Sequence, residues 1–141
     1  MQRRLPELAA STPVTAVMAS PVVSVDPEAP VRDLLRLFVA GGIGAAPVVD
    51  SRGEAIGVVS KTDVLRAVYE NLPEGDSDVP ARDLMTPAPL TVPESASIAE
   101  AASIMAREHV HRLFVVGQAG TLAGVVSAMD LVRWLGRDEH P

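Results

Sequence analysis

The sequence predicts an α+β fold in which one β-α-β-β-α unit occurs twice. The first observation is a gap-free internal repeat, because residues 17–66 match residues 84–133 at a constant offset of 67 residues. The clearest match is the motif Gly-Val-Val-Ser-x-x-Asp, which ends at Asp63 and again at Asp130. The second observation is that strand-like and helix-like hydrophobic periodicities alternate in the same order within each copy. Such a repeat predicts two units that pack together about a pseudo-two-fold axis.

In the first copy, each element follows from a local pattern. The spacing i, i+3, i+4, i+7, i+8 from Val31 to Val39 predicts an amphipathic helix, and Gly41 and Gly42 end it. Ser60 and Asp63 have the spacing of a capping box, with Asp in place of Glu or Gln, and predict the start of a second helix. The predicted strands are residues 22–25, 46–49 and 55–59, the last two forming a hairpin, and the second helix covers residues 60–69.

The second copy repeats this order. Ser97 is the predicted cap of a helix whose core positions include Ile98 and Met105. The other predicted elements are strand 90–92, the hairpin strands 113–116 and 122–126, and the helix 128–135. We therefore divide the chain into an N-terminal arm (1–13), a first unit (14–70), a linker (71–80), a second unit (81–135) and a tail (136–141).

Composition excludes several classes of protein. The net charge of −6 argues against nucleic acid as a partner, since phosphate backbones require a basic face. The chain contains no cysteine, which excludes disulfides, thiolate metal sites and cysteine nucleophiles. No apolar run approaches the roughly 20 residues of a membrane span, and no signal peptide is recognisable. We expect a cytoplasmic protein with no membrane partner and an aliphatic core.

The repeated motif places a serine and an aspartate in the first turn of a helix that follows a buried strand. Free backbone N–H groups and the helix dipole favour anions there. A carboxylate accepts two hydrogen bonds at once, which suits the diol of a ribose. The alternative is that Ser60 and Asp63 only cap their helix. The second copy, at Ser127 and Asp130, favours a ligand-binding role.

The combined pattern resembles a known family. The repeat, the segment Ala46-Pro47-Val48-Val49-Asp50-Ser51-Arg52-Gly53 and the two Gly-Val-Val-Ser-x-x-Asp motifs look like a tandem pair of CBS domains, the Bateman module, over residues 14–135. The resemblance implies two CBS units packed through their sheets. It also implies two clefts that often bind adenine nucleotides or adenosine derivatives, and no obligatory cofactor.

The resemblance also implies site residues. In the first site, adenine-side contacts would come from Ser20, Val22 and Val23, and ribose or phosphate contacts from Ser60, Lys61, Thr62, Asp63, His111 and Arg112. The second, weaker site would use Thr86, Leu90, Ser127 and Asp130.

The two sites are expected to differ in phosphate binding. Gly44 and Ala45 stand in the first copy where the second has His111 and Arg112, so the Asp130 site lacks this basic pair. An oligophosphate needs cationic donors. We therefore expect the Asp63 site to be the better nucleotide site. The alternative for Lys61 and Arg112 is that they are ordinary solvated charges.

The function predicted from these residues is a stand-alone, non-catalytic regulatory module. It would bind AMP, ADP or ATP in the cleft between the two CBS units, signal to a separate effector protein, and form a homodimer through its last helices. The alternative is a structural or oligomerisation module with vestigial clefts. No catalytic motif supports a third reading, a nucleotide-hydrolysing enzyme. His109 and His111 have no evident third ligand for a metal site.

Overall fold

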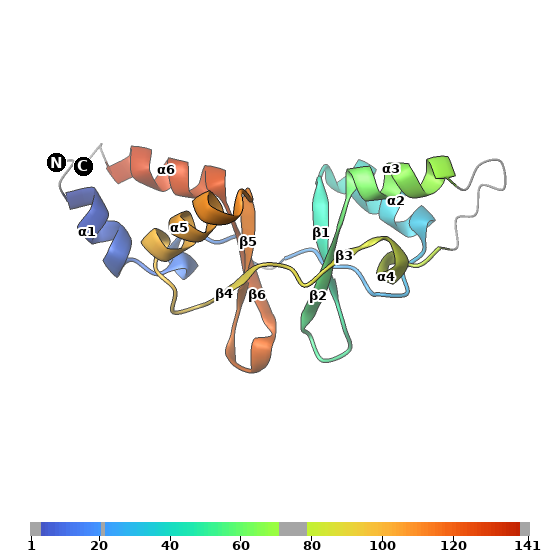
Figure 1. Ribbon diagram of the computed structural model, residues 1–141, viewed down its shortest axis with the longest axis horizontal. Coiled ribbons are helices and arrows are strands. Elements are labelled where there is room, and N and C mark those ends of the chain that lie inside the picture. The colour runs from blue at the N-terminus through green and yellow to red at the C-terminus, as the bar shows by residue number, and fades with distance from the viewer. Residues whose placement is uncertain (1–3, 21, 71–78, 139–141) are drawn as a thin grey trace. The chain divides into compact units, whose positions relative to one another are not determined.

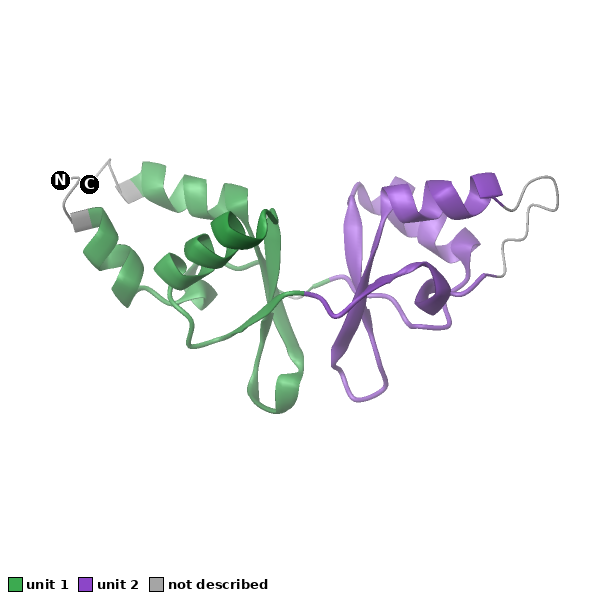
Figure 2. Ribbon diagram, viewed as in Figure 1, with its two compact units in different colours: residues 1–22, 90–141 green, residues 23–89 purple. Residues whose placement is uncertain are grey.

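The computed structural model describes residues 4–20, 22–70 and 79–138, and the chain forms two compact units (Figures 1 and 2). Unit 1 comprises residues 1–22 and 90–141, and unit 2 comprises residues 23–89. The α+β fold class predicted from the sequence is confirmed, because each unit contains a three-stranded sheet and several helices.

In unit 2, the helices lie on one side of the sheet (Figure 1). The sheet has the order β1-β2-β3, and all its pairs are antiparallel. Helix α2 is amphipathic, as predicted, and buries Val31, Leu34 and Phe38. The chain leaves α2 through Gly42, whose φ of 63° is the left-handed conformation that glycine adopts without strain. The elements are α2 (Val31–Gly41), β1 (Ala45–Val49), β2 (Ala55–Ser60), α3 (Lys61–Glu70), α4 (Ala81–Leu84) and β3 (Thr86–Pro87).

Unit 1 also contains a three-stranded sheet, of order β4-β5-β6, but here the edge strand β4 is parallel to β5, whereas β5 and β6 are antiparallel. The predicted cap at Ser97 is present. Its hydroxyl accepts from the Glu100 N–H at 3.1 Å, and the Glu100 carboxylate accepts from the Ser97 N–H at 3.2 Å. The elements are α1 (Arg4–Ser11), η1 (Val14–Ala16), β4 (Thr91–Pro93), α5 (Ile98–Glu108), β5 (Arg112–Val116), η2 (Gln118–Gly120), β6 (Leu122–Ser127) and α6 (Ala128–Asp138).

Each unit contains a short segment from the sequence repeat that forms most of the other unit. Val14 precedes the first hairpin in the chain, yet it is fully buried in the core of unit 1, which is built mainly from the second repeat. Its equivalent Ala81 is fully buried in the core of unit 2. Each repeat therefore completes its apolar core with a residue from the other, which adds buried apolar surface to units of about 60 residues, a size that is marginal for a separate core.

Two repeat-equivalent glycines make this exchange possible. A Cβ on Gly57 would overlap the sulfur of Met85 and lie 3.0 Å from the Thr86 carbonyl oxygen. A Cβ on Gly124 would lie 2.5 Å from the sulfur of Met18. The methionine of each repeat therefore packs against the glycine of the other, at a distance that no larger residue permits.

Three segments differ from the sequence-based expectation. Residues 4–11 of the predicted arm form helix α1, which contacts α5. The predicted strand 22–25 is reduced to one parallel bridge between Val25 and Val48, because a proline on either side limits its ladder. Helix α4 and strand β3 were not predicted, since four and two residues are too few for a periodic signal. The linker falls mainly in residues 71–78, which lie outside the described residues.

Across residues 4–20, 22–70 and 79–138, we find no helix with both the length and the apolar character that a membrane crossing requires.

Candidate functional site

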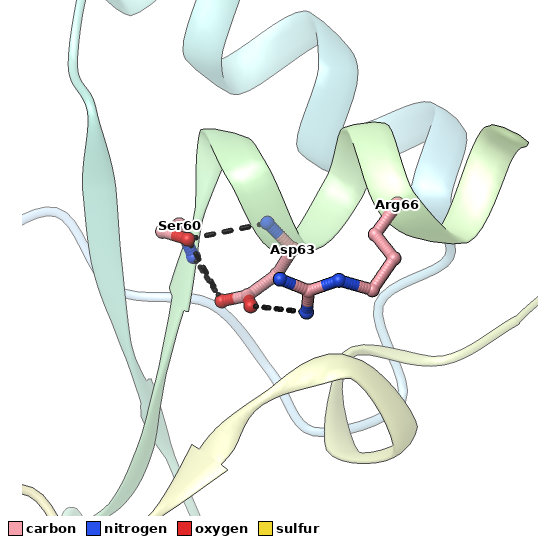
Figure 3. Close-up of polar contacts among 3 residues, drawn as sticks. All are labelled: Ser60, Asp63 and Arg66. Atoms are coloured by element: carbon pink, nitrogen blue, oxygen red, sulfur yellow. Dashed lines mark hydrogen bonds and ion pairs between the residues drawn. The ribbon is translucent and has the colours of Figure 1, made fainter.

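In unit 2, Ser60 and Asp63 form a closed hydrogen-bonded box at the start of α3 (Figure 3). The Asp63 Oδ2 accepts from the Ser60 backbone N–H at 2.8 Å and from the Ser60 hydroxyl at 2.9 Å. The Asp63 N–H donates to the Ser60 Oγ at 3.2 Å. The predicted capping box is therefore present, and an aspartate performs the role usually played by Glu or Gln.

Unit 1 has the same box at the start of α6. The Asp130 Oδ2 accepts from the Ser127 N–H at 2.8 Å, and the Asp130 N–H donates to the Ser127 Oγ at 3.1 Å. The side chains of Asp63 and Asp130 are 14% and 23% exposed. Both carboxylates are thus held in a fixed rotamer while part of their surface stays open to solvent.

The second oxygen of each carboxylate, Oδ1, makes a longer contact, with an arginine. Within the described part of the chain, Asp63 Oδ1 contacts only Arg66 Nη1, at 3.5 Å, and Asp130 Oδ1 contacts only Arg133 Nη1, at 3.6 Å. These arginines are 60% and 67% exposed, so the contacts are weak and easily replaced. The box therefore presents one positioned acceptor oxygen, with a cation beside it, to a ligand hydroxyl.

The roles of Arg66 and Arg133 were not predicted from the sequence. The signal was present, because both arginines occupy the same position of the repeat, three residues after the aspartate. One helical turn separates residues i and i+3, which brings each guanidinium to its carboxylate.

Each box is joined to the beginning of the first hairpin strand of its unit. The Lys61 N–H donates to the Gly44 carbonyl at 3.0 Å, and the Ala128 N–H donates to the His111 carbonyl at 2.8 Å. We call each of these points a strand–helix junction. In unit 1, the junction also contains Arg112, which pairs with Ser127 in the β5–β6 ladder.

The two units divide the predicted site residues differently from the sequence-based grouping. Thr86 shares a sheet with the Asp63 box, since it pairs with Val58 of β2. Ser20 follows Ala19, which bridges to Val125 of β6, the strand that leads into the Asp130 box. Unit 2 contains Val23, Ser60, Lys61, Thr62, Asp63 and Thr86, and unit 1 contains Ser20, Val22, Leu90, His111, Arg112, Ser127 and Asp130.

Among the described residues, no group of three or more histidine, cysteine or carboxylate side chains has a metal-binding arrangement. Tyr69 is 80% exposed on α3, whereas Trp134 packs against the core of unit 1.

The repeated α+β unit with a serine–aspartate box after its hairpin defines a class of duplicated α+β modules. The sequence profile of the CBS domain matches residues 14–70 and again residues 81–137. The chain belongs to the CBS-domain family and contains a tandem pair of these domains, as the sequence predicted.

Known proteins with similar sequences include a dehydrogenase. The inosine-5'-monophosphate dehydrogenase of Korarchaeum cryptofilum is 36% identical over 120 residues, which are 85% of this chain and 23% of that protein. The chain spans 23–46% of the length of three such curated relatives.

Two solved structures have the same fold. CBSX2 of Arabidopsis thaliana in complex with AMP has a TM-score of 0.78 and 29% identity, covering 92% of this chain and 99% of that chain. The CBS domain of a bacterial CNNM/CorC family Mg²⁺ transporter in complex with ATP has a TM-score of 0.79 and 26% identity, covering 94% and 92%.

Proposed function

We propose that this CBS pair is a non-catalytic regulatory module that binds an adenine nucleotide or an adenosine derivative. The observation that carries the proposal is the carboxylate of the serine–aspartate box, which occurs in both units with one oxygen held by the box and, among the described residues, the other contacting only an exposed arginine. A ribose diol can donate to such a carboxylate, and the preformed rotamer lowers the entropy lost on binding.

The similar structures support this ligand class. CBSX2 was solved with AMP and the transporter CBS domain with ATP, and these ligands share an adenosine group. For this chain, the nucleotide would bias the equilibrium between two conformational or oligomeric states, and a partner protein would respond to the favoured state.

The strand pairing suggests a revised assignment of the adenine-side residues. Because Thr86 lies on the sheet that leads into the Asp63 box, we assign Thr86 to that site together with Val23. Ser20 and Val22 share unit 1 with Asp130 and Leu90, so we assign them to the other site. The ribose residues remain Ser60, Thr62 and Asp63 in one site and Ser127 and Asp130 in the other.

Exposed apolar side chains support a homodimer. Leu65 on α3 is 67% exposed, and its repeat equivalent Val132 on α6 is 57% exposed. Tyr69 and Met129 extend these two faces and are 80% and 54% exposed. Apolar exposure at equivalent positions of both repeats fits two faces covered by a second copy of the chain, a proposal that sedimentation velocity tests.

A structural module is the second candidate, because the hydrogen bonds between Ser60 and Asp63 cap the helix by themselves. Substitution of the carboxylate by an amide separates the two functions. In Asp63→Asn, the amide oxygen still accepts from Ser60, so the cap remains, while the negative charge that receives the diol is lost. We expect AMP and adenosine to bind about tenfold or more weakly, which corresponds to about 1.4 kcal/mol.

The matched control is Asp33→Asn. Asp33 also lies in the first turn of a helix and faces an arginine three residues later, Arg36, at 3.9 Å. It therefore reproduces the loss of the helix-dipole contribution, about 0.5 kcal/mol, without touching the box. Isothermal titration with AMP, adenosine and ATP measures the affinities. If none of them binds the unmodified protein, or if the two variants bind equally well, the ligand-binding proposal is wrong.

A further inference from the structure

Lys61, the only lysine of the chain, lies across the strand–helix junction of unit 2. Its Cε is 3.5 Å and its Nζ 4.0 Å from the position that a Cβ on Gly44 would occupy. Its backbone N–H donates to the Gly44 carbonyl at 3.0 Å. The lysine stem therefore covers the glycine, and the ammonium group lies at the start of β1.

Unit 1 has the opposite arrangement at the equivalent positions. His111 and Arg112 replace Gly44 and Ala45 on the strand, and Ala128 replaces Lys61 on the helix. The backbone bond across the junction is the same, from the Ala128 N–H to the His111 carbonyl at 2.8 Å. A cationic residue thus occurs at the strand–helix junction of both units, on the strand in one and on the helix in the other.

Among the described residues, Lys61 and Arg112, the cations at the two junctions, lack the carboxylate partners that most of the other cations have. Six arginines pair with carboxylates within 4.0 Å, namely Arg36, Arg52, Arg66, Arg82, Arg107 and Arg133. Among residues 4–20, 22–70 and 79–138, no carboxylate pairs with Lys61 or Arg112. Both are exposed, so an anionic ligand can reach them without breaking an existing ion pair.

We infer that Lys61 is a phosphate-binding residue and the functional counterpart of the His111–Arg112 pair. The chain then binds two phosphorylated adenosine ligands, with one junction contributing to each. This inference rests on the proposed function, because it assumes that the ligand is an adenosine derivative. It replaces the expectation that one site lacks a phosphate-binding cation: Gly44 and Ala45 are uncharged, but the Lys61 ammonium group lies beside Gly44.

Titration with AMP and with adenosine tests the role of the charge. We expect two AMP molecules per chain. Lys61→Ala should weaken one class of AMP sites about tenfold and change adenosine binding less than twofold, since adenosine has no phosphate. Arg112→Ala should weaken the other class. The control is Arg52→Ala, which removes an exposed cation from the hairpin turn, away from both junctions.

A rescue variant tests whether cationic side chains on the strand can replace the lysine on the helix. A Cβ at position 44 would lie in ordinary van der Waals contact with Lys61 Cε, at 3.5 Å, so a side chain placed there lies beside the lysine. The triple variant Gly44→His, Ala45→Arg, Lys61→Ala therefore transfers the unit 1 arrangement into unit 2. We expect it to recover most of the AMP affinity that Lys61→Ala loses. A merely structural role for Lys61 would not distinguish AMP from adenosine and would not be rescued.

The single lysine also allows a chemical test on the unmodified protein. An amine-acylating reagent can modify only one side chain, and peptide mass spectrometry measures the extent at Lys61. AMP should protect it, and adenosine should not. One AMP per chain, or AMP affinities unchanged by Lys61→Ala, overturns the inference while the proposed function stands. Failure of both AMP and adenosine to bind overturns the two together.

Discussion

The contact between Gly57 and Met85 joins the two repeats, and Gly57→Ala tests it directly. The new methyl group would overlap the sulfur of Met85, and it would lie 2.8 Å from its Cγ and 3.0 Å from the Thr86 carbonyl oxygen. Ordinary carbon contacts are about 3.5–4.0 Å, so the methionine must move by about 1 Å or change rotamer, while the Thr86 backbone is held by its pairing with Val58. Such overpacking costs about 1–3 kcal/mol of unfolding free energy.

Urea unfolding followed by far-ultraviolet circular dichroism measures this cost. With a slope of about 2 kcal/mol per molar urea, a loss of 2 kcal/mol lowers the midpoint by about 1 M. The matched control is Gly136→Ala in α6, where a Cβ has no heavy atom within 4 Å. Alanine is favoured over glycine within a helix, so this variant should be unchanged or more stable by up to about 1 kcal/mol.

A double-mutant cycle identifies the partner. Met85→Ala removes the sulfur that the new methyl group meets, so Gly57→Ala should cost at least about 1 kcal/mol less in the Met85→Ala background. The reasoning is refuted if Gly57→Ala behaves like Gly136→Ala, or if the two substitutions at Gly57 and Met85 are simply additive.

Two further predictions concern the exchanged core and the proposed dimer. Val14→Ala should lower the unfolding free energy by about 2 kcal/mol, because Val14 is fully buried, whereas Val23→Ala, at 52% exposure, should change it by less than about 0.5 kcal/mol. Equal effects would contradict the place of Val14 in the unit 1 core. Leu65→Glu combined with Val132→Glu should convert a dimer to a monomer in sedimentation velocity, while Arg36→Glu should not. A sedimentation coefficient that the double substitution leaves unchanged would argue against this interface.

Local patterns were sufficient for most elements of the fold. Amphipathic spacing predicted α2 to its first residue, Val31, and the spacing of Ser60 and Asp63 predicted the capping box that begins α3. These features depend on residues within a few positions of each other, so the sequence contains their whole cause.

The candidate site was predicted only in part. The two boxes were identified because both copies of the motif contain them. Arg66 was missed, although the repeat preserves it, because its role depends on one helical turn bringing a guanidinium to a carboxylate. The position of Thr86 on the sheet of the Asp63 box could not be predicted, since a two-residue strand has no periodic signal.

The sequence by itself determined the duplication, the order of elements in each copy and the serine–aspartate chemistry. The tertiary structure decided which repeat completes which core. Val14 and Ala81 are buried in units built mainly from the other repeat, and Met85 and Gly57 meet although they are 28 positions apart. Such contacts join residues that are far apart in the sequence. They depend on the tertiary path of the chain, which local propensity does not determine. The same holds for Lys61, whose charge lies over Gly44 only because strand and helix meet at one junction.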